Sequence, residues 1–487
     1  MTSMPRRVLR SLALCAGVVP AALPAPSWAQ TAPAAQSGPV LTRDMTLAEL
    51  GFRNGVTFQQ LSGTQTVYFP VPSGPDFDRM ELHLSLNSGA TTPADRYVRI
   101  SVGGRILASR GLTEADDSFA LTFPIDASDV QSGFVPVRFD YSGANTERVC
   151  FDERMSGDFL TVAPDSGLRL TMAPDQVASS ALFAGLKPTR TVIGLADNAG
   201  LADMAALTRA AALLGADQGL VGFGAAQGGP DWTVAQINIA ATADGPVSDM
   251  RVAADGALPV LTVSGTDPQV GLAQLLSPWT GLTGEGRTVT SAANQPVAAG
   301  NRLPLAALGG DLSSRAVKGS EDFTVNFSAS DIPPGKIVSD LSVTAVSGLD
   351  PDGNGATLSV SLNEVLLGSR TLSAGVPQNL SFAVPAGLIG SENTLRFHVQ
   401  RQPVAGACRY TMQGYPAQIL PGSALVLSDG SGEAHEFHEL RQAAGQGVQL
   451  VIDRDLSLSS AELAPWLAGV AGSILPDRAP VVPRADM

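Results

Sequence analysis

The sequence has few basic residues, few aromatic residues and almost no cysteine. Lys and Arg number 31 against 45 Asp and Glu, which gives a formal net charge of −14. This balance argues against binding to nucleic acid or to anionic lipid headgroups. Aromatic residues make up only 5% of the chain, so few side chains can stack on flat ligands. After residue 30 no run of 18 apolar residues occurs, and the sequence therefore predicts no membrane-spanning helix there.

Catalytic and metal-binding motifs are also lacking. There is no G-x-S-x-G elbow and no H-E-x-x-H pair. Residues 350–355 match the first half of a calcium loop, but Ser361 stands where the bidentate Glu belongs, so a turn is the better interpretation. His435 and His438 fit a solvated helix start, and the glycines of residues 222–229 lack the strand and helix of a dinucleotide site. We therefore expect no catalytic residues, no metal and no cofactor, and a protein that is not an enzyme.

The N-terminus has the pattern of a secretory signal peptide. Arg6, Arg7 and Arg10 precede an apolar run at residues 12–23, and Ser27-Trp28-Ala29 supplies a cleavage site. We assign residues 1–29 to this signal and residues 30–44, rich in Ala, Pro, Gln and Ser, to a flexible leader. The mature chain is then exported.

Two cysteines, Cys150 and Cys408, follow the signal peptide. In an oxidising compartment they could form a disulfide. They occupy equivalent places in two internal repeats, so pairing would require the two repeats to meet there. The sequence leaves this open.

An internal repeat organises the rest of the chain. Residues 101–112 and 361–372 both read as a strand, a two-residue turn and a second strand, at an offset of 260 residues. Gly103-Gly104 and Asn363-Glu364 stand at the turns, where positive φ is needed. Arg138-Phe139 is echoed by Arg396-Phe397, and in each copy a cysteine follows the Phe by 11 residues. We infer a duplicated β-rich module.

This repeat, together with the pattern of strand-like and helix-like segments around it, predicts four domains. Short strand-like runs separated by turns predict β-sandwiches, jelly-roll-like, at residues 45–175 and 301–430. Strands alternating with helices predict an α/β domain with parallel strands at 176–300. Residues 431–487 read as a helix, a strand, a second helix and a Pro-rich tail, that is, an incomplete second α/β domain. One such unit cannot close a sheet alone, so we expect it to dock on the rest of the protein.

Exposed aromatic side chains would be the candidates for binding a sugar ring, because their flat apolar faces can stack on a pyranose. Core packing is the competing role for each of them. We single out Tyr97, Tyr141 and Tyr410 from a wider set that also holds Tyr415, Trp232 and Trp279.

The order of the domains resembles the periplasmic regulatory B subunit of bacterial cellulose synthase, a family also named for cyclic di-GMP binding. Local stretches carry the resemblance further: the C-x-D segment at residues 150–153, the helix of residues 206–215, and the strand-to-helix junction at residues 261–267. The similarity extends over residues 45–455. The shortened second α/β domain and the absence of a C-terminal anchor helix depart from the family pattern.

The resemblance implies a fold and a role. The sandwiches would be carbohydrate-binding-like and the α/β domains flavodoxin-like. The protein would be a non-catalytic accessory subunit in the periplasm, peripherally associated with the inner membrane. It would guide a β-glucan chain away from the catalytic subunit of cellulose synthase. The alternative is a free periplasmic glycan-binding protein without a synthase partner, and homo-oligomerisation stays open.

Overall fold

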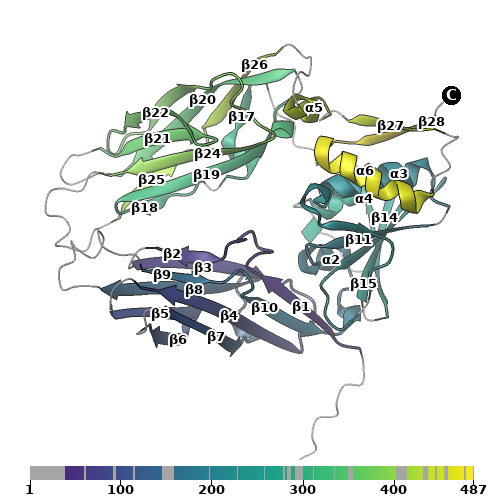
Figure 1. Cartoon of the computed structure of the whole chain (residues 1–487), viewed down its shortest axis with the longest axis horizontal. Helices are drawn as coiled ribbons and strands as arrows, with labels where there is room; N and C mark the ends of the chain where they lie inside the picture. The colour runs from purple at the N-terminus through teal and green to yellow at the C-terminus, as the bar shows by residue number, and fades with distance from the viewer. Residues whose placement is uncertain are drawn as a thin grey trace, which may run out of the picture. The chain divides into compact units, whose positions relative to one another are not determined.

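The computed structural model describes residues 39–487 apart from a set of gaps. In the described part strands far outnumber helices (Figure 1), which confirms the prediction of a β-rich chain of several domains. The predicted signal peptide and residues 30–38 of the leader lie outside the described residues. The gaps are residues 60–61, 91–94, 113–115, 145–157, 197, 228, 257, 278–279, 282–286, 291–299, 311, 334, 349–354, 402–413, 431–436, 445–446, 454–458, 477–478 and 486–487.

The first β-sandwich consists of two antiparallel sheets. One has the strand order β1-β10-β4-β9-β2 with β7 also paired to β4, and the other has the order β3-β8-β5-β6. In the central strands alternate side chains point inward, and those such as Leu82 and Phe139 are fully buried in one apolar core. The strands are β1 (Leu41–Thr46), β2 (Val56–Phe58), β3 (Ser62–Pro70), β4 (Arg79–Gly89), β5 (Asp95–Val102), β6 (Arg105–Gly111), β7 (Asp116–Pro124), β8 (Phe134–Ala144), β9 (Phe159–Val162) and β10 (Gly167–Met172).

The sandwich begins earlier than its predicted start at residue 45. Residues 41–44, which we placed in the leader, belong to β1 and pair with β10. Leu41 is fully buried and Met45 nearly so, with more exposed residues between them. The inward side of this short strand holds the apolar Leu41 and Met45, and also Arg43, which is buried because it donates to the carbonyl oxygen of Leu186 at 2.6 Å and pairs with Glu49.

The second β-sandwich repeats the first strand for strand. Its sheets have the orders β17-β26-β20-β25-β18, with β23 paired to β20, and β19-β24-β21-β22. Each strand therefore has a counterpart in the first sandwich, and the topology confirms the internal repeat. The strands are β17 (Arg302–Pro304), β18 (Arg315–Val317), β19 (Ser320–Ser328), β20 (Lys336–Ser347), β21 (Thr357–Leu362), β22 (Val365–Thr371), β23 (Gln378–Ala383), β24 (Glu392–Gln400), β25 (Tyr415–Ile419) and β26 (Ala424–Asp429).

The two hairpins that revealed the repeat share their detailed geometry. Gly103 and Gly104 have φ of 58° and 90°, and Asn363 and Glu364 have φ of 48° and 67°, as a two-residue turn matched to the strand twist requires. Both hairpins also shift register at the same place, after Ile100 in one and after the equivalent Val360 in the other. The predicted turns are confirmed.

A six-stranded mixed sheet lies between the two sandwiches in the sequence. Its order is β12-β11-β13-β15-β14-β16. The first four strands run parallel, as the alternation of strands and helices predicts, while β14 runs antiparallel to both of its neighbours, β15 and β16. The flavodoxin-like assignment stays a prediction. The elements are α2 (Ser180–Leu186), β11 (Thr191–Leu195), α3 (Leu201–Leu213), β12 (Val221–Phe223), β13 (Ala235–Ala241), β14 (Ser248–Asp255), β15 (Leu258–Gly265), α4 (Pro268–Leu275) and β16 (Arg287–Thr290).

The ends of the helices in this region follow local sequence signals. Gly215 adopts φ 80° just beyond α3, which suits the C-terminal stop predicted there. Asp267 caps α4 by accepting a hydrogen bond from the Gln269 backbone N–H at 3.2 Å. The Asp203 carboxylate accepts from the backbone N–H of Gly200 at 2.8 Å and of Ala241 at 2.6 Å. It therefore ties the start of α3 to the end of β13.

The last segment forms a small layer of its own. It comprises α5 (Phe437–Ala443), β27 (Val448–Ile452), α6 (Ser460–Ile474) and β28 (Val481–Ala485). β27 and β28 pair in parallel. The Pro-rich tail of our prediction is thus a strand. It forms because the tail pairs with the backbone of β27, and the local sequence gives no signal of this pairing. Pro483 is compatible with this place because β28 is an edge strand.

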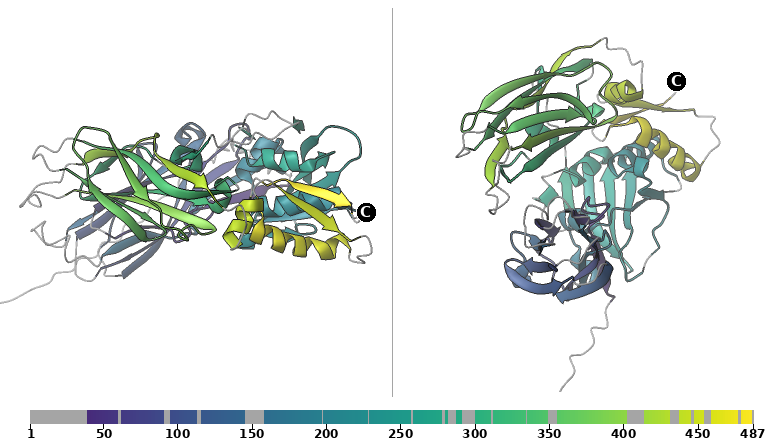
Figure 2. Two further views of the ribbon diagram at one scale, coloured as in Figure 1. Left: turned by 90° about the horizontal axis from the view of Figure 1, so that it is seen from above. Right: turned by 60° about the vertical axis from the view of Figure 1, so that its left-hand side comes forward.

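The last segment docks on the α/β region through small side chains. Ala468 and Ala471 of α6 are buried in one cluster with Ala205 and Ala211 of α3, and the two helices lie side by side (Figures 1 and 2). Alanine on both helices allows their backbones to approach closely. Among the helices that the structure describes, none is long and apolar enough to cross a membrane.

Candidate functional site

The candidate site is the outer side of the four-stranded sheet of the first sandwich, which we call the aromatic face. Strand alternation sends the side chains of Tyr68 on β3, Tyr97 on β5 and Phe134 on β8 to this side, away from the core. They are 58%, 50% and 42% exposed. Aromatic side chains at such positions leave apolar surface exposed to water, so we take them as the candidate contact surface.

The aromatic side chains mark the two ends of the face. The rings of Tyr68 and Phe134 meet edge to face, with centroids 6.3 Å apart and an interplanar angle of 88°. Tyr97 stands beside Ser142 of β8, whereas Tyr68 stands beside Pro136 of the same strand. Six residues of strand separate these two positions, which corresponds to about 20 Å along β8. The face is therefore long enough to contact an extended ligand.

A charged cluster occupies the centre of the aromatic face. The Asp140 carboxylate accepts from Arg138 Nη2 at 2.8 Å, from Thr64 Oγ1 at 2.8 Å and from Arg99 Nη2 at 3.4 Å. Hydrogen bonding from the Arg138 guanidinium, followed by Thr64 and the charge of Arg99, holds the pKa of Asp140 below its ordinary value. The same bond raises the pKa of Arg138. The charges of Asp140 and Arg138 are therefore both present at neutral pH.

The second sandwich offers the same surface without the aromatic side chains. In its outer four-stranded sheet the register positions of Tyr68, Tyr97 and Phe134 are taken by Asn326, Thr357 and Glu392. Arg396 occupies the position of Arg138, and it pairs with Asp322, which also accepts from His398 Nδ1 at 2.7 Å. The second sandwich thus has a charged pair at the centre of this face, in a different arrangement, but it has no aromatic side chains at the three register positions.

The structure separates the three tyrosines of our prediction. Tyr97 lies on the aromatic face. Tyr141 is only 2% exposed, and its ring lies 5.9 Å from that of Phe58 in the core, so it is unavailable for stacking and the prediction is corrected. Burial also raises the pKa of its phenol. Tyr410 lies outside the described residues, as do Cys150 and Cys408.

The reason for the correction is strand parity. Residues 135, 137, 139 and 141 of β8 point inward, and residues 134, 136, 138 and 140 point outward. The alternation of apolar and polar residues in β8 would have identified the outward set. The prediction from sequence missed five residues of the face, namely Tyr68, Phe134, Arg99, Arg138 and Asp140. Of the other aromatic candidates, Trp232 is buried, Tyr415 is half-buried under Arg401, and Trp279 lies outside the described residues.

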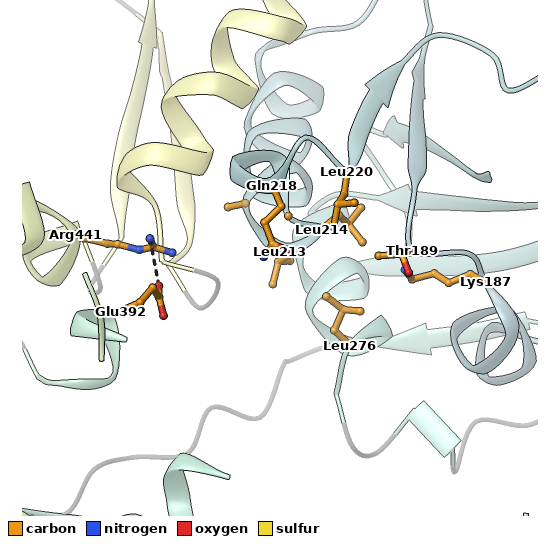
Figure 3. Close-up of a pocket in the computed structure, with 11 residues that line it drawn as sticks. Lys187, Thr189, Leu213, Leu214, Gln218, Leu220, Leu276, Glu392 and Arg441 are labelled. Atoms are coloured by element: carbon orange, nitrogen blue, oxygen red, sulfur yellow. Dashed lines mark ion pairs between the residues drawn. The ribbon is translucent and has the colours of Figure 1, made fainter. Parts of the chain in front are cut away.

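A pocket of about 470 Å³ lies beside α3. Figure 3 shows apolar side chains such as Leu213 and Leu220 on one side of it and the Glu392–Arg441 ion pair, at 3.5 Å, on the other. Lys187 also lines the pocket, and burial, followed by the charge of Arg43, lowers its pKa. The lining residues do not pair a nucleophile with a base, and we assign no chemistry to them. Among the described residues, no three His, Cys, Asp or Glu side chains are grouped to hold a metal ion.

Comparison with known proteins gives neighbours in structure only. No protein-family model and no curated protein matches the chain. One solved structure is the M60 catalytic domain with the CBM51-1 and CBM51-2 domains of ZmpB from Clostridium perfringens, at 8% identity and a TM-score of 0.19, covering 77% of this chain and 34% of that chain. A second is the CBM27-1 of Caldicellulosiruptor saccharolyticus in complex with mannohexaose, at 12% identity and a TM-score of 0.16, covering 22% and 76%. A third is a family two carbohydrate esterase from Clostridium thermocellum in complex with cellohexaose, at 10% identity and a TM-score of 0.15, covering 36% and 49%. These scores are too low to support an argument about the fold or the function of this chain.

Proposed function

We propose that this protein binds a glycan on the aromatic face of its first sandwich and serves as a non-catalytic accessory protein in polysaccharide export. The observation that carries the proposal is the set of three half-exposed aromatic side chains around a charged, hydrogen-bonding centre. The apolar face of a pyranose ring stacks on a flat aromatic ring, and its hydroxyls bond to charged and polar groups at the edge. Both kinds of contact are available here.

A binding role fits the centre of the face better than a catalytic one. A general acid for glycoside cleavage needs a carboxyl whose pKa is raised so that it keeps its proton. The carboxyl of Asp140 has the opposite character, because its pKa is lowered and its oxygens are engaged by Arg138 and Thr64. Turnover of a panel of glucans, abolished by Asp140→Asn, would contradict this part of the proposal.

The resemblance to the cellulose synthase B subunit suggests a more specific location and partner for the protein. The exported chain would stay in the periplasm, peripheral to the inner membrane, and guide a β-glucan from the synthase catalytic subunit. The alternative is a free periplasmic glycan-binding protein. Co-purification from mild-detergent membrane extracts separates the two, because a stoichiometric glycosyltransferase supports the first and a protein recovered alone from the periplasmic fraction supports the second.

Affinity electrophoresis through gels that contain soluble β-glucan tests the binding itself. Aromatic side chains have about 150–250 Å² of surface, and Tyr97 is half exposed, so a sugar ring on one face would cover about 50 Å². At about 25 cal/mol per Å² this stabilises the complex by about 1.3 kcal/mol, or about tenfold in Kd. Tyr97→Ala should therefore weaken retention about tenfold.

Thr357→Ala is the matched control, because Thr357 holds the register position of Tyr97 in the second sandwich. Its retention should equal that of the unmodified protein. If Tyr97→Ala and Tyr68→Ala both leave retention unchanged, the aromatic face is not the binding surface.

A further inference from the structure

At the centre of the aromatic face, two guanidinium groups supply more hydrogen-bond donors and more positive charge than the single neighbouring carboxylate can pair with. Arg138 and Arg99 stand on either side of a single carboxylate, that of Asp140. The bonds that the structure describes for Asp140 come from Arg138 Nε and Nη2, Arg99 Nη2 and Thr64 Oγ1. A carboxylate has only two oxygens, and both are already occupied by these donors.

The guanidinium groups keep donors that face the solvent. Each guanidinium has five N–H donors. In the described bonds on this face, Arg99 donates through Nη2 only, and Arg138 through Nε and Nη2. Their side chains are 50% and 53% exposed, whereas that of Asp140 is only 17% exposed. A ligand that lies on the face would therefore meet the two cations before it meets the anion.

The positive charge at the centre of the aromatic face is opposite in sign to the net charge of the chain, and the outer face of the second sandwich does not share it. The chain as a whole has a formal net charge of −14. On the outer face of the second sandwich, Arg396 is the guanidinium at the centre, and it is paired with Asp322. Among the described residues of the aromatic face, the other acid is Asp95, four residues along β5 from Arg99, which is about 13 Å away. The positive centre is therefore a specific property of the first sandwich.

We propose that the aromatic face selects a glycan that bears anionic substituents, such as carboxylates. The aromatic side chains would hold the sugar rings, and the free N–H groups of Arg99 and Arg138 would bind the anionic groups, for which planar guanidinium donors are well suited. This inference rests on the proposed glycan binding. It differs from that proposal in naming acidic sugars, rather than a neutral glucan, as the preferred ligand class.

The test compares two hexasaccharides with the same linkage, a β-1,4-glucan hexamer and a β-1,4-glucuronan hexamer, by isothermal titration calorimetry with the full-length mature protein. We expect the glucuronan to bind more tightly at low salt, by about threefold to fivefold for each arginine that contributes. The preference should shrink when salt is raised above 0.1 M, where the screening length falls below about 10 Å. Arg138→Gln should reduce this preference, because it should lower the affinity for the glucuronan hexamer more than the affinity for the neutral hexamer.

Arg396→Gln is the matched control, since Arg396 has the register position of Arg138 in the second sandwich. It should leave the preference unchanged. Equal binding of both hexamers, or a preference that survives in the Arg99→Gln, Arg138→Gln double variant, overturns this inference and leaves the proposed glycan binding intact. If neither hexamer binds, the proposed function fails and this inference fails with it.

Discussion

The attachment of the last strand depends on one buried glutamine. Gln269 on α4 donates from Nε2 to the carbonyl oxygen of Val481 at 2.8 Å, and its Oε1 accepts from the Val481 N–H at 2.9 Å. The side-chain amide thus pairs with β28 as a neighbouring strand would. Gln269 is 7% and Val481 1% exposed, so water cannot replace these two bonds.

The change Gln269→Leu should release the end of the chain without unfolding the rest. It leaves a buried N–H and a buried C=O on Val481 without partners, at about 1–3 kcal/mol each and about 2–6 kcal/mol together. A two-stranded sheet such as β27–β28 has little stability of its own, so the loss should appear as local opening. Amide hydrogen exchange in β27 should then accelerate by at least about thirtyfold, while amides of β8 keep their protection.

Gln449→Leu is the control for this experiment. Gln449 lies on the exposed side of β27 and accepts one hydrogen bond, from Arg484 Nη1 at 3.2 Å. Its loss should change local stability by less than about 0.5 kcal/mol. If Gln269→Leu leaves the exchange of β27 as slow as in the unmodified protein, the glutamine does not hold the strand, and the alanine contacts of α6 suffice.

The repeat and the charged cluster lead to three further predictions. Glu364 has φ 67°, so Glu364→Gly should relieve about 1 kcal/mol of strain and raise the melting temperature of the second sandwich, and a lower melting temperature would contradict the turn assignment. Phe139 and Phe397 are equivalent and fully buried, so Phe139→Ala and Phe397→Ala should each cost about 3–5 kcal/mol, each seen as an earlier thermal transition of its own sandwich. The pKa of Asp140 is lowered, so its stabilising contribution is complete above the ordinary carboxyl pKa of about 3.9 and is lost as the pH falls below that value. A titration by NMR should give a carboxyl midpoint under about 3.9, rising in Arg138→Gln, and an ordinary midpoint would refute the cluster.

Much of the fold could be predicted from the sequence because its signals are local. The hairpin turns at Gly103-Gly104 and Asn363-Glu364 are indicated by residues that tolerate positive φ, and the 260-residue offset ties them together. The cap at Asp267 and the stop at Gly215 are likewise set by neighbouring residues. Each of these features depends on a few consecutive positions.

Features that depend on distant partners could not be predicted in this way. Residues 481–485 have no strand pattern and contain Pro483, yet they form β28 because β27 and Gln269 supply hydrogen bonds. The helix α3 is buried on nearly every side, and only the structure shows that α6 covers one side of it. The buried Tyr141 is a different kind of error, since the alternation along β8 was present in the sequence and an aromatic side chain alone was given too much weight.

The two copies show which residues the sandwich needs and which it does not. Several inward positions keep their apolar character from one copy to the other, as in Phe69 and Phe327 or Phe139 and Phe397. The outward positions of the aromatic side chains differ, as in Tyr97 and Thr357.

The second copy folds with the same topology without any aromatic side chain at the three register positions, so the aromatic side chains of the first copy are not required by the fold. Their presence on one copy alone is the observation behind the proposed glycan binding, and the second face serves as an internal reference for every measurement of it.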